Sequence, residues 1–145
     1  MQTNYYLPLA FEKVIKKKPL PVGDMEDSIK QFLSLILTTH LGEYRFDNGF
    51  GCEIWDWNYH NIHSVNKWKT TFKKQITEAI LASEKRLRSV EVNIQLTQLP
   101  VVEKDSSIVA KHRQKIFITI TGTMIYTNKP LQHQEMIYFS PLSLV

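Results

Sequence analysis

The spacing of apolar residues changes once along this chain, between residues 87 and 90, and this change most limits the folds open to it. Before it, apolar residues recur with the spacing of amphipathic helices. After it, Val90, Val92, Ile94 and Leu96 alternate with polar residues, which is the two-residue repeat of a half-buried strand. Strands that follow consecutive helices favour an α+β fold with an antiparallel sheet.

Two helices are expected before the change. The first begins after Asp24, whose side chain suits an N-cap, and Gly42 is expected to end it. The second is expected from about Ser64 to Leu87. Each has one apolar face, made in the first helix by Met25, Ile29, Phe32, Leu33, Ile36 and Leu37, and in the second by Val65, Trp68, Phe72, Ile76, Ala79, Ile80 and Leu87.

Two more strands follow the first. Residues 115–126 and 134–139 have strand character, and a turn is expected at residues 128–130, while residues 100–112 form a loop or a long hairpin tip. The fold class is therefore α+β, with two main helices packed on a mostly antiparallel sheet of about three to four strands. Residues 1–23 are expected to form an irregular N-terminal arm, because their prolines exclude a helix interior, and residues 24–145 a single domain.

Composition narrows the function classes. The chain has 145 residues and a net charge of +4, without the dense basic and aromatic footprint of a nucleic-acid-binding protein. Its one cysteine, Cys52, excludes an internal disulfide and fits a reducing compartment. No apolar run approaches the ~20 residues of a membrane span, and no secretory signal is visible. We therefore expect a cytoplasmic protein.

The segment from Leu37 to Gly51 joins the two helices and is unusual for an enzyme loop. Glu43 and Arg45 follow Gly42, and a turn signal precedes Gly51. The two charged residues could bind a partner or hold the loop against the second helix, and the sequence leaves both interpretations open.

In their order and spacing, four short pieces resemble the contractile-tail baseplate wedge family, the phage gene-25-like family whose type VI secretion member is TssE. They are Asp27-Ser28-Ile29, Gly42-Glu43-Tyr44-Arg45-Phe46 with Phe50-Gly51, Ile76-Thr77-Glu78-Ala79-Ile80, and Glu84-Lys85-Arg86-Leu87. The resemblance implies a structural wedge subunit that links the baseplate to the sheath and starts sheath assembly. Its implied partners are TssF-like and TssG-like wedge proteins and TssB/TssC-like sheath subunits.

The last of these pieces is the family's site for wedge partners, which implies partner-binding roles for Glu84, Arg86 and Leu87. The family usually has a proline where this chain has Lys85, so the helix is expected to run further. Residues two apart on a helix do not face each other, so we expect Glu84 and Arg86 to pair elsewhere. Two alternatives remain, a solvated helix end and an internal pair such as Glu84 with Arg45.

The last strand is the candidate docking edge. Met136 and Tyr138 lie on one face, and Ile137 and Phe139 lie on the other. An edge strand exposes unpaired backbone groups that can accept a further strand. The alternative is a central strand covered within the monomer.

Three other functions remain as alternatives: a hydrolase, a metal site and a general interaction adaptor. A lysozyme-like glycoside hydrolase could use Glu43 with Glu53 or Asp56, beside Trp55 and Trp57, but these carboxylates show no means of tuning. A metal site could use Cys52, His60 and His63, but their spacing is not that of a zinc site. A general interaction adaptor is the third alternative. We predict no catalytic residue, cofactor or metal.

Overall fold

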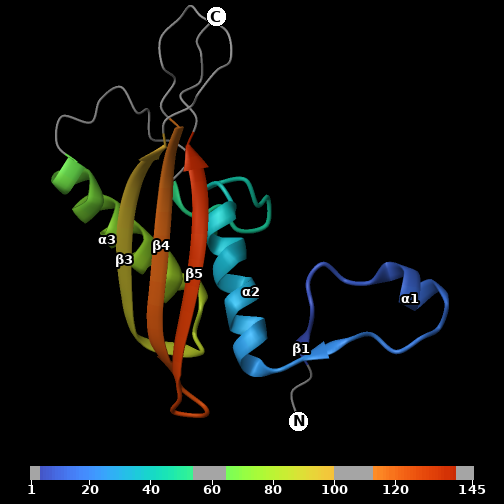
Figure 1. Ribbon diagram of the computed structural model, residues 1–145. Coiled ribbons are helices and arrows are strands. Elements are labelled where there is room, and N and C mark those ends of the chain that lie inside the picture. The colour runs from blue at the N-terminus through green and yellow to red at the C-terminus, as the bar shows by residue number, and fades with distance from the viewer. Residues whose placement is uncertain (1–3, 54–64, 100–112, 140–145) are drawn as a thin grey trace, which may run out of the picture.

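The computed structural model describes residues 4–53, 65–99 and 113–139 (Figure 1). In chain order these residues form β1 (Asn4–Tyr5), α1 (Phe11–Ile15), β2 (Val22–Gly23), α2 (Met25–Thr38), α3 (Val65–Ser83), β3 (Leu87–Leu99), β4 (Arg113–Met124) and β5 (Pro130–Phe139). The predicted α+β class is confirmed. The expected loop or hairpin tip at residues 100–112 lies outside the described residues.

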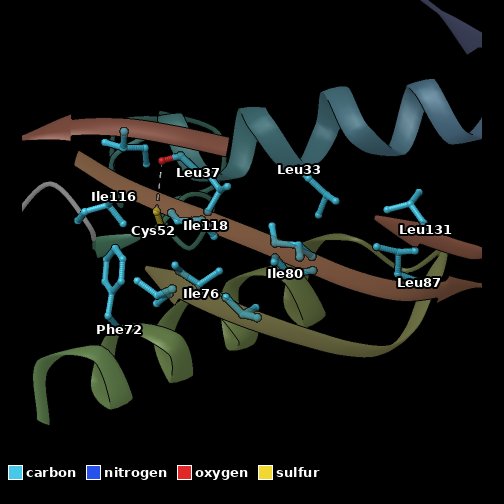
Figure 2. Packing of buried hydrophobic residues seen from close by; sticks show 14 of the residues in the cluster. Leu33, Leu37, Cys52, Phe72, Ile76, Ile80, Leu87, Ile116, Ile118 and Leu131 are labelled. Atoms are coloured by element: carbon cyan, nitrogen blue, oxygen red, sulfur yellow. Dashed lines mark hydrogen bonds between the residues drawn. The ribbon is translucent and has the colours of Figure 1, made fainter. Parts of the chain in front are cut away.

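The main sheet is antiparallel and has the strand order β3-β4-β5. Helix α3 lies along β3, and α2 lies along β5 (Figure 1). Both helices pack on the same face of the sheet, because their apolar side chains share one core with those of all three strands (Figure 2). The core is therefore a single layer between two helices and one sheet face.

Strand alternation decides which face is buried. On β4, Ile116, Ile118 and Ile120 are fully buried, and their neighbours Val92 and Ile94 on β3 are also buried. The residues between Val92, Ile94 and Leu96 on β3 are exposed, so the opposite face of the sheet is open in the described part of the chain. The predicted two-residue repeat has set the orientation of the sheet.

Helix α2 begins as predicted but ends early. The carboxylate of Asp24 accepts a hydrogen bond from the Asp27 amide at 2.7 Å, which confirms the N-cap. The helix ends at Thr38, and Gly42 (φ +80°) lies in the turn that follows. Thr39 is extended, and its hydroxyl donates to the Leu35 carbonyl at 2.7 Å, so the side chain satisfies a carbonyl in the last turn of the helix. The prediction that Gly42 ends the helix was wrong.

Helix α3 ends at Ser83, four residues before the predicted end at Leu87. Lys85 does not prolong it, which corrects that expectation. Its ammonium group instead donates to the Leu81 carbonyl at 2.7 Å and satisfies one of the last free acceptors of the helix. Leu87 is already the first residue of β3 and is buried in the core.

The N-terminal segment is more ordered than the expected irregular arm. β1 pairs antiparallel with β2, and the short helix α1 lies between them (Figure 1). We call residues 4–23 the arm. It projects from the start of α2, and the division into arm and single domain stays a prediction. Within the described ranges, no helix combines the length and apolarity that a bilayer crossing requires.

Candidate functional site

Glu84 and Arg86 form a two-pronged ion pair at the end of α3. One oxygen of Glu84, Oε1, accepts from both the backbone amide and Nε of Arg86 at 2.8 Å, while Oε2 lies 2.6 Å from the terminal guanidinium nitrogen Nη2. Glu84 is only 2% exposed. The expectation that these two residues pair elsewhere was wrong, because α3 has ended before Glu84 and the chain turns back on itself. The helical geometry behind that expectation therefore does not apply.

The guanidinium of Arg86 also reaches the first turn of α2. Its Nη1 donates to the Ser28 hydroxyl at 2.9 Å, and its central carbon lies 6.0 Å from the centre of the Phe32 ring. The hydrogen bond from Glu84 raises the pKa of Arg86 above its ordinary value, against an opposing effect of burial. The pair therefore joins the end of α3 to the beginning of α2, a fork that lysine could not reproduce.

These contacts limit what the site can offer to a partner. Glu84 and Leu87 are buried, whereas the side chain of Arg86 is a quarter exposed (25%). Of these three residues, only Arg86 presents side-chain surface to a partner in the folded protein. The partner-binding roles of all three residues stay predictions.

Glu43 and Arg45 lie in the exposed turn after α2. The Glu43 carboxylate accepts a hydrogen bond from the His40 amide at 2.9 Å, and Arg45 lies 5.1 Å over the Phe46 ring. Neither contacts Glu84 or Arg86 in the described structure, so the internal pair of Glu84 with Arg45 is not formed. Glu43 holds its own loop, and Arg45 is available at the surface.

Strand β5 is at the edge of the described sheet. The amide of Met124 donates to the Lys129 carbonyl, and the amide of Ile125 donates to the Arg86 carbonyl, each at 2.9 Å. Even-numbered residues of β4 therefore bond toward β5. Since the register is continuous from Thr123–Pro130 to Gln114–Phe139, the amides of Met136 and Tyr138 face away from β4, and that of Ile137 faces β4.

The side chains of β5 also alternate, between the face that the helices cover and the open face of the sheet. Ile137 is 5% exposed under the helices, whereas Met136 and Tyr138 are 42% and 54% exposed on the open face. Beside them on β4 lies Phe117, and the Lys115 ammonium is 4.6 Å from its ring and 5.5 Å from the Tyr138 ring. We call the three exposed residues Phe117, Met136 and Tyr138, together with the half-buried Lys115, the open-face patch.

The sequence interpretation missed a polar cluster between α2 and β5. The Ser34 hydroxyl donates to Glu135 at 2.6 Å and lies 3.1 Å from Nε2 of His133, which is 3.2 Å from the same carboxylate oxygen. One signal could have found it, since His133 and Glu135 are two apart on a strand and share its buried face. It is not a catalytic triad, because Glu135 bonds the nitrogen that faces the serine.

The hydrolase and metal alternatives gain little support from the described residues. Glu53 accepts a hydrogen bond from Gln75 at 2.6 Å and lines an open hollow of about 240 Å³, which is below the size of an ordinary ligand pocket. Cys52 is buried, and its thiol donates to the Leu37 carbonyl at 3.4 Å (Figure 2). Trp55, Asp56, Trp57, His60 and His63 lie outside the described residues.

Two helices pack on one face of a three-stranded antiparallel sheet, and a forked Glu-Arg pair joins them. The family described as baseplate wedge protein gp25 matches residues 23–129, and the chain belongs to this family. It is a structural component of a baseplate and contacts other baseplate proteins.

Comparison with solved structures agrees on the fold. A crystal structure of a Geobacter sulfurreducens protein, provisionally named a tail lysozyme, is similar with a TM-score of 0.59 and 21% identity. The likeness covers 83% of this chain and 96% of that one. At this identity the likeness shows the fold alone. No curated protein matches the chain.

Proposed function

We propose that this protein is the TssE-like wedge subunit of a contractile injection machine of the type VI secretion class. It joins TssF-like and TssG-like wedge proteins in the cytoplasm and starts the TssB/TssC-like sheath by strand pairing. The observation that carries the proposal is the edge of β5, where the outward amides of Met136 and Tyr138 pair with no further strand of the described chain.

Strand addition needs both backbone groups and a surface for side chains. The outward edge of β5 supplies the backbone donors and acceptors. The open-face patch lies beside that edge and supplies apolar contact area, since Met136 and Tyr138 belong to both. An incoming sheath strand would therefore find its hydrogen bonds and its side-chain contacts at one place.

Proline substitution on β5 tests this proposal. Met136→Pro removes an amide that faces outward, so the monomer should fold while sheath assembly on purified baseplates stops. Ile137→Pro is the matched control in the same strand, because it removes an amide that faces β4 and disturbs a buried position. It should lower the unfolding temperature strongly. Monomer stability is measured by circular dichroism, and sheath growth by electron microscopy.

The result that contradicts the proposal is specific. If Met136→Pro folds and sheaths still assemble at the wild-type rate, β5 is not the docking edge. The strand-pairing part of the function would then fall, while membership of the baseplate would stand.

The predicted wedge contacts at Glu43, Arg45, Glu84, Arg86 and Leu87 need a test that separates binding from folding. Arg45→Ala changes an exposed side chain and should weaken co-purification with TssF-like and TssG-like proteins without a change in unfolding temperature. Arg86→Ala should weaken co-purification and also lower the unfolding temperature, because Arg86 also joins α3 to α2. Equal co-purification of wild type and both variants would remove Arg45 and Arg86 from the interface.

A lysozyme-like activity is the second candidate, raised by the name of the similar Geobacter sulfurreducens structure. We expect no release of soluble fragments from peptidoglycan by the purified protein, since Glu43 and Glu53 are engaged by His40 and Gln75. Release that Glu43→Gln or Glu53→Gln abolishes would overturn the purely structural function.

A further inference from the structure

The arm exposes an unusual amount of apolar surface. Its short helix α1 contains no buried residue. Phe11 is 66% exposed, Val14 50% and Ile15 81%. These three residues are spaced i, i+3 and i+4, so they lie on one face of the helical turn. We call this face the arm tip. A soluble protein seldom leaves such a face uncovered in its working state.

The base of the arm is held in place, so the tip is presented at a defined position. The Tyr6 hydroxyl donates to the Asp27 carboxylate at 2.8 Å, and the Leu7 amide donates to Gln31 at 2.9 Å. The hydrogen bond to Asp27 raises the pKa of Tyr6. Both contacts attach the arm to the first turns of α2, and the tip projects beyond them (Figure 1).

Lysines surround the tip in a fixed shape. Lys13, Lys16, Lys17 and Lys18 lie on or next to α1, and the nearby acid, Glu12, is paired with Lys16. The amide of Lys18 donates to the Lys13 carbonyl at 2.8 Å and that of Lys17 to Val14 at 3.0 Å, with Lys17 at φ +52°. This is a Schellman ending, which fixes the backbone of the lysine run at the end of α1.

We infer that the arm tip docks into an apolar groove bordered by carboxylates on a neighbouring baseplate protein. The apolar face supplies the buried contact, and the lysines select an acidic border. A second copy of this chain is a poor occupant, because a symmetric contact of the tip with itself would bring the lysine runs together. A membrane surface is also a poor one, because amphipathic membrane helices need several turns and α1 has five residues.

This inference goes beyond the family. The gp25 family match begins at residue 23, so α1 and the arm tip lie outside the matched region. The contact is independent of β5, which is at the far side of α2 from the arm tip (Figure 1). It rests on the proposed function only in taking the TssF-like and TssG-like wedge proteins as the partners to be tested.

The experiment uses the full chain and those two wedge proteins, with affinity measured by biolayer interferometry. Phe11→Asp with Ile15→Asp, and separately Lys16→Glu with Lys17→Glu, should each weaken binding about tenfold or more. Their unfolding temperatures should not change, because α1 buries no residue. The matched controls on α3, Leu81→Asp for the apolar change and Lys73→Glu with Lys74→Glu for the charge reversal, should bind as wild type.

Four outcomes overturn the inference. If both arm variants bind the wedge proteins with wild-type affinity, the inference fails while the proposed function stands. The same holds if the wild type forms a homodimer that the Phe11→Asp with Ile15→Asp variant does not form. The inference also fails if the wild type binds phosphatidylglycerol vesicles, and the same variant loses this binding but still binds the wedge proteins. If the wild type binds neither wedge protein, the proposed function and this inference fail together.

Discussion

At the scale of single residues, Gly51 shows why the loop after α2 has its sequence. Its φ is +107°, and a Cβ atom there would lie 2.6 Å from the Thr39 carbonyl oxygen. The approach is close because the Cys52 amide donates to that same oxygen at 3.0 Å, within a bridge between His40 and Cys52. Both the backbone conformation and the available space require glycine.

Gly51→Ala should therefore lower the free energy of unfolding by about 2–4 kcal/mol, through strain and the contact with Thr39. Gly42→Ala is the matched control, since Gly42 also has a positive φ (+80°) but no atom within 4 Å of the added carbon. It should cost only about 1 kcal/mol. Urea denaturation measures both, and equal losses would show that the close approach to Thr39 has no energetic weight.

Glu84 gives a second prediction at this scale. Glu84→Gln removes the charge from a carboxylate that is 2% exposed, and should cost about 1.5–3 kcal/mol because the charge-assisted hydrogen bonds to Arg86 are lost while Arg86 keeps partial access to water. Glu12→Gln breaks the exposed pair of Glu12 with Lys16 and should cost less than about 0.5 kcal/mol. Similar losses measured by urea denaturation would mean that burial of Glu84 does not strengthen its pair.

The raised pKa of Arg86 determines how this pair responds to pH. A cation whose pKa is higher in the folded state stabilises the fold below its unfolded pKa, and this stabilisation is lost only as pH rises past that value. For arginine the loss lies in strong alkali. The contribution of Arg86 to the free energy of unfolding should therefore be constant between about pH 6 and 9. It is measured as the difference in free energy of unfolding between wild type and Arg86→Ala, and a difference that falls as pH rises would contradict the prediction.

At the scale of elements, β3 carries an irregularity that no sequence pattern indicated. The register with β4 shifts between Arg88 and Glu91, and Ser89 has φ +53° inside this bulge. The bulge lies between the ion pair at Glu84 and the regular part of the strand. Such a bulge turns the strand and places its side chains correctly for the rest of the sheet.

Ser89→Gly should raise the free energy of unfolding by about 0.5–1 kcal/mol, because glycine adopts positive φ without a steric cost. Glu91→Gly, two residues further in the regular ladder, should lower it by a similar amount. Thermal unfolding followed by circular dichroism would detect both. A destabilised Ser89→Gly would show that the serine side chain does more at the bulge than occupy it.

Element type followed from the sequence much more securely than element ends. The apolar stripes of α2 and α3 and the alternation at Val92 and Ile94 reported the buried faces correctly, because periodicity is a local property. The ends depended on distant contacts. Helix α2 stops at Thr38 where the chain pairs with Cys52, and α3 stops at Ser83 where Glu84 turns to meet Arg86.

At the scale of the whole molecule, the arm and the two-helix, three-stranded body differ in how they are held. The core runs from Ile29 to Ile137 and includes no arm residue. The arm is joined to α2 by two side-chain hydrogen bonds, those of Tyr6 with Asp27 and Leu7 with Gln31. We therefore expect the body to fold without the arm.

Removal of residues 1–22 should change the unfolding temperature by no more than about 2–4 °C, since exposed hydrogen bonds contribute little to stability. Differential scanning calorimetry measures the temperature and shows whether one cooperative transition remains. A transition that disappears or falls far lower would mean that the arm is part of the folding unit, which contradicts the predicted division at residue 24.

The sequence by itself determined the α+β class, the orientation of the helices and strands toward a core, and the family resemblance, because each of these is recorded in local spacing. Only the tertiary structure decided that Glu84 pairs with Arg86, that Ile137 is buried while Met136 and Tyr138 stay exposed, and that Phe11, Val14 and Ile15 project without cover. The physical reason is that pairing and burial depend on which elements meet in space, and local periodicity does not contain that information.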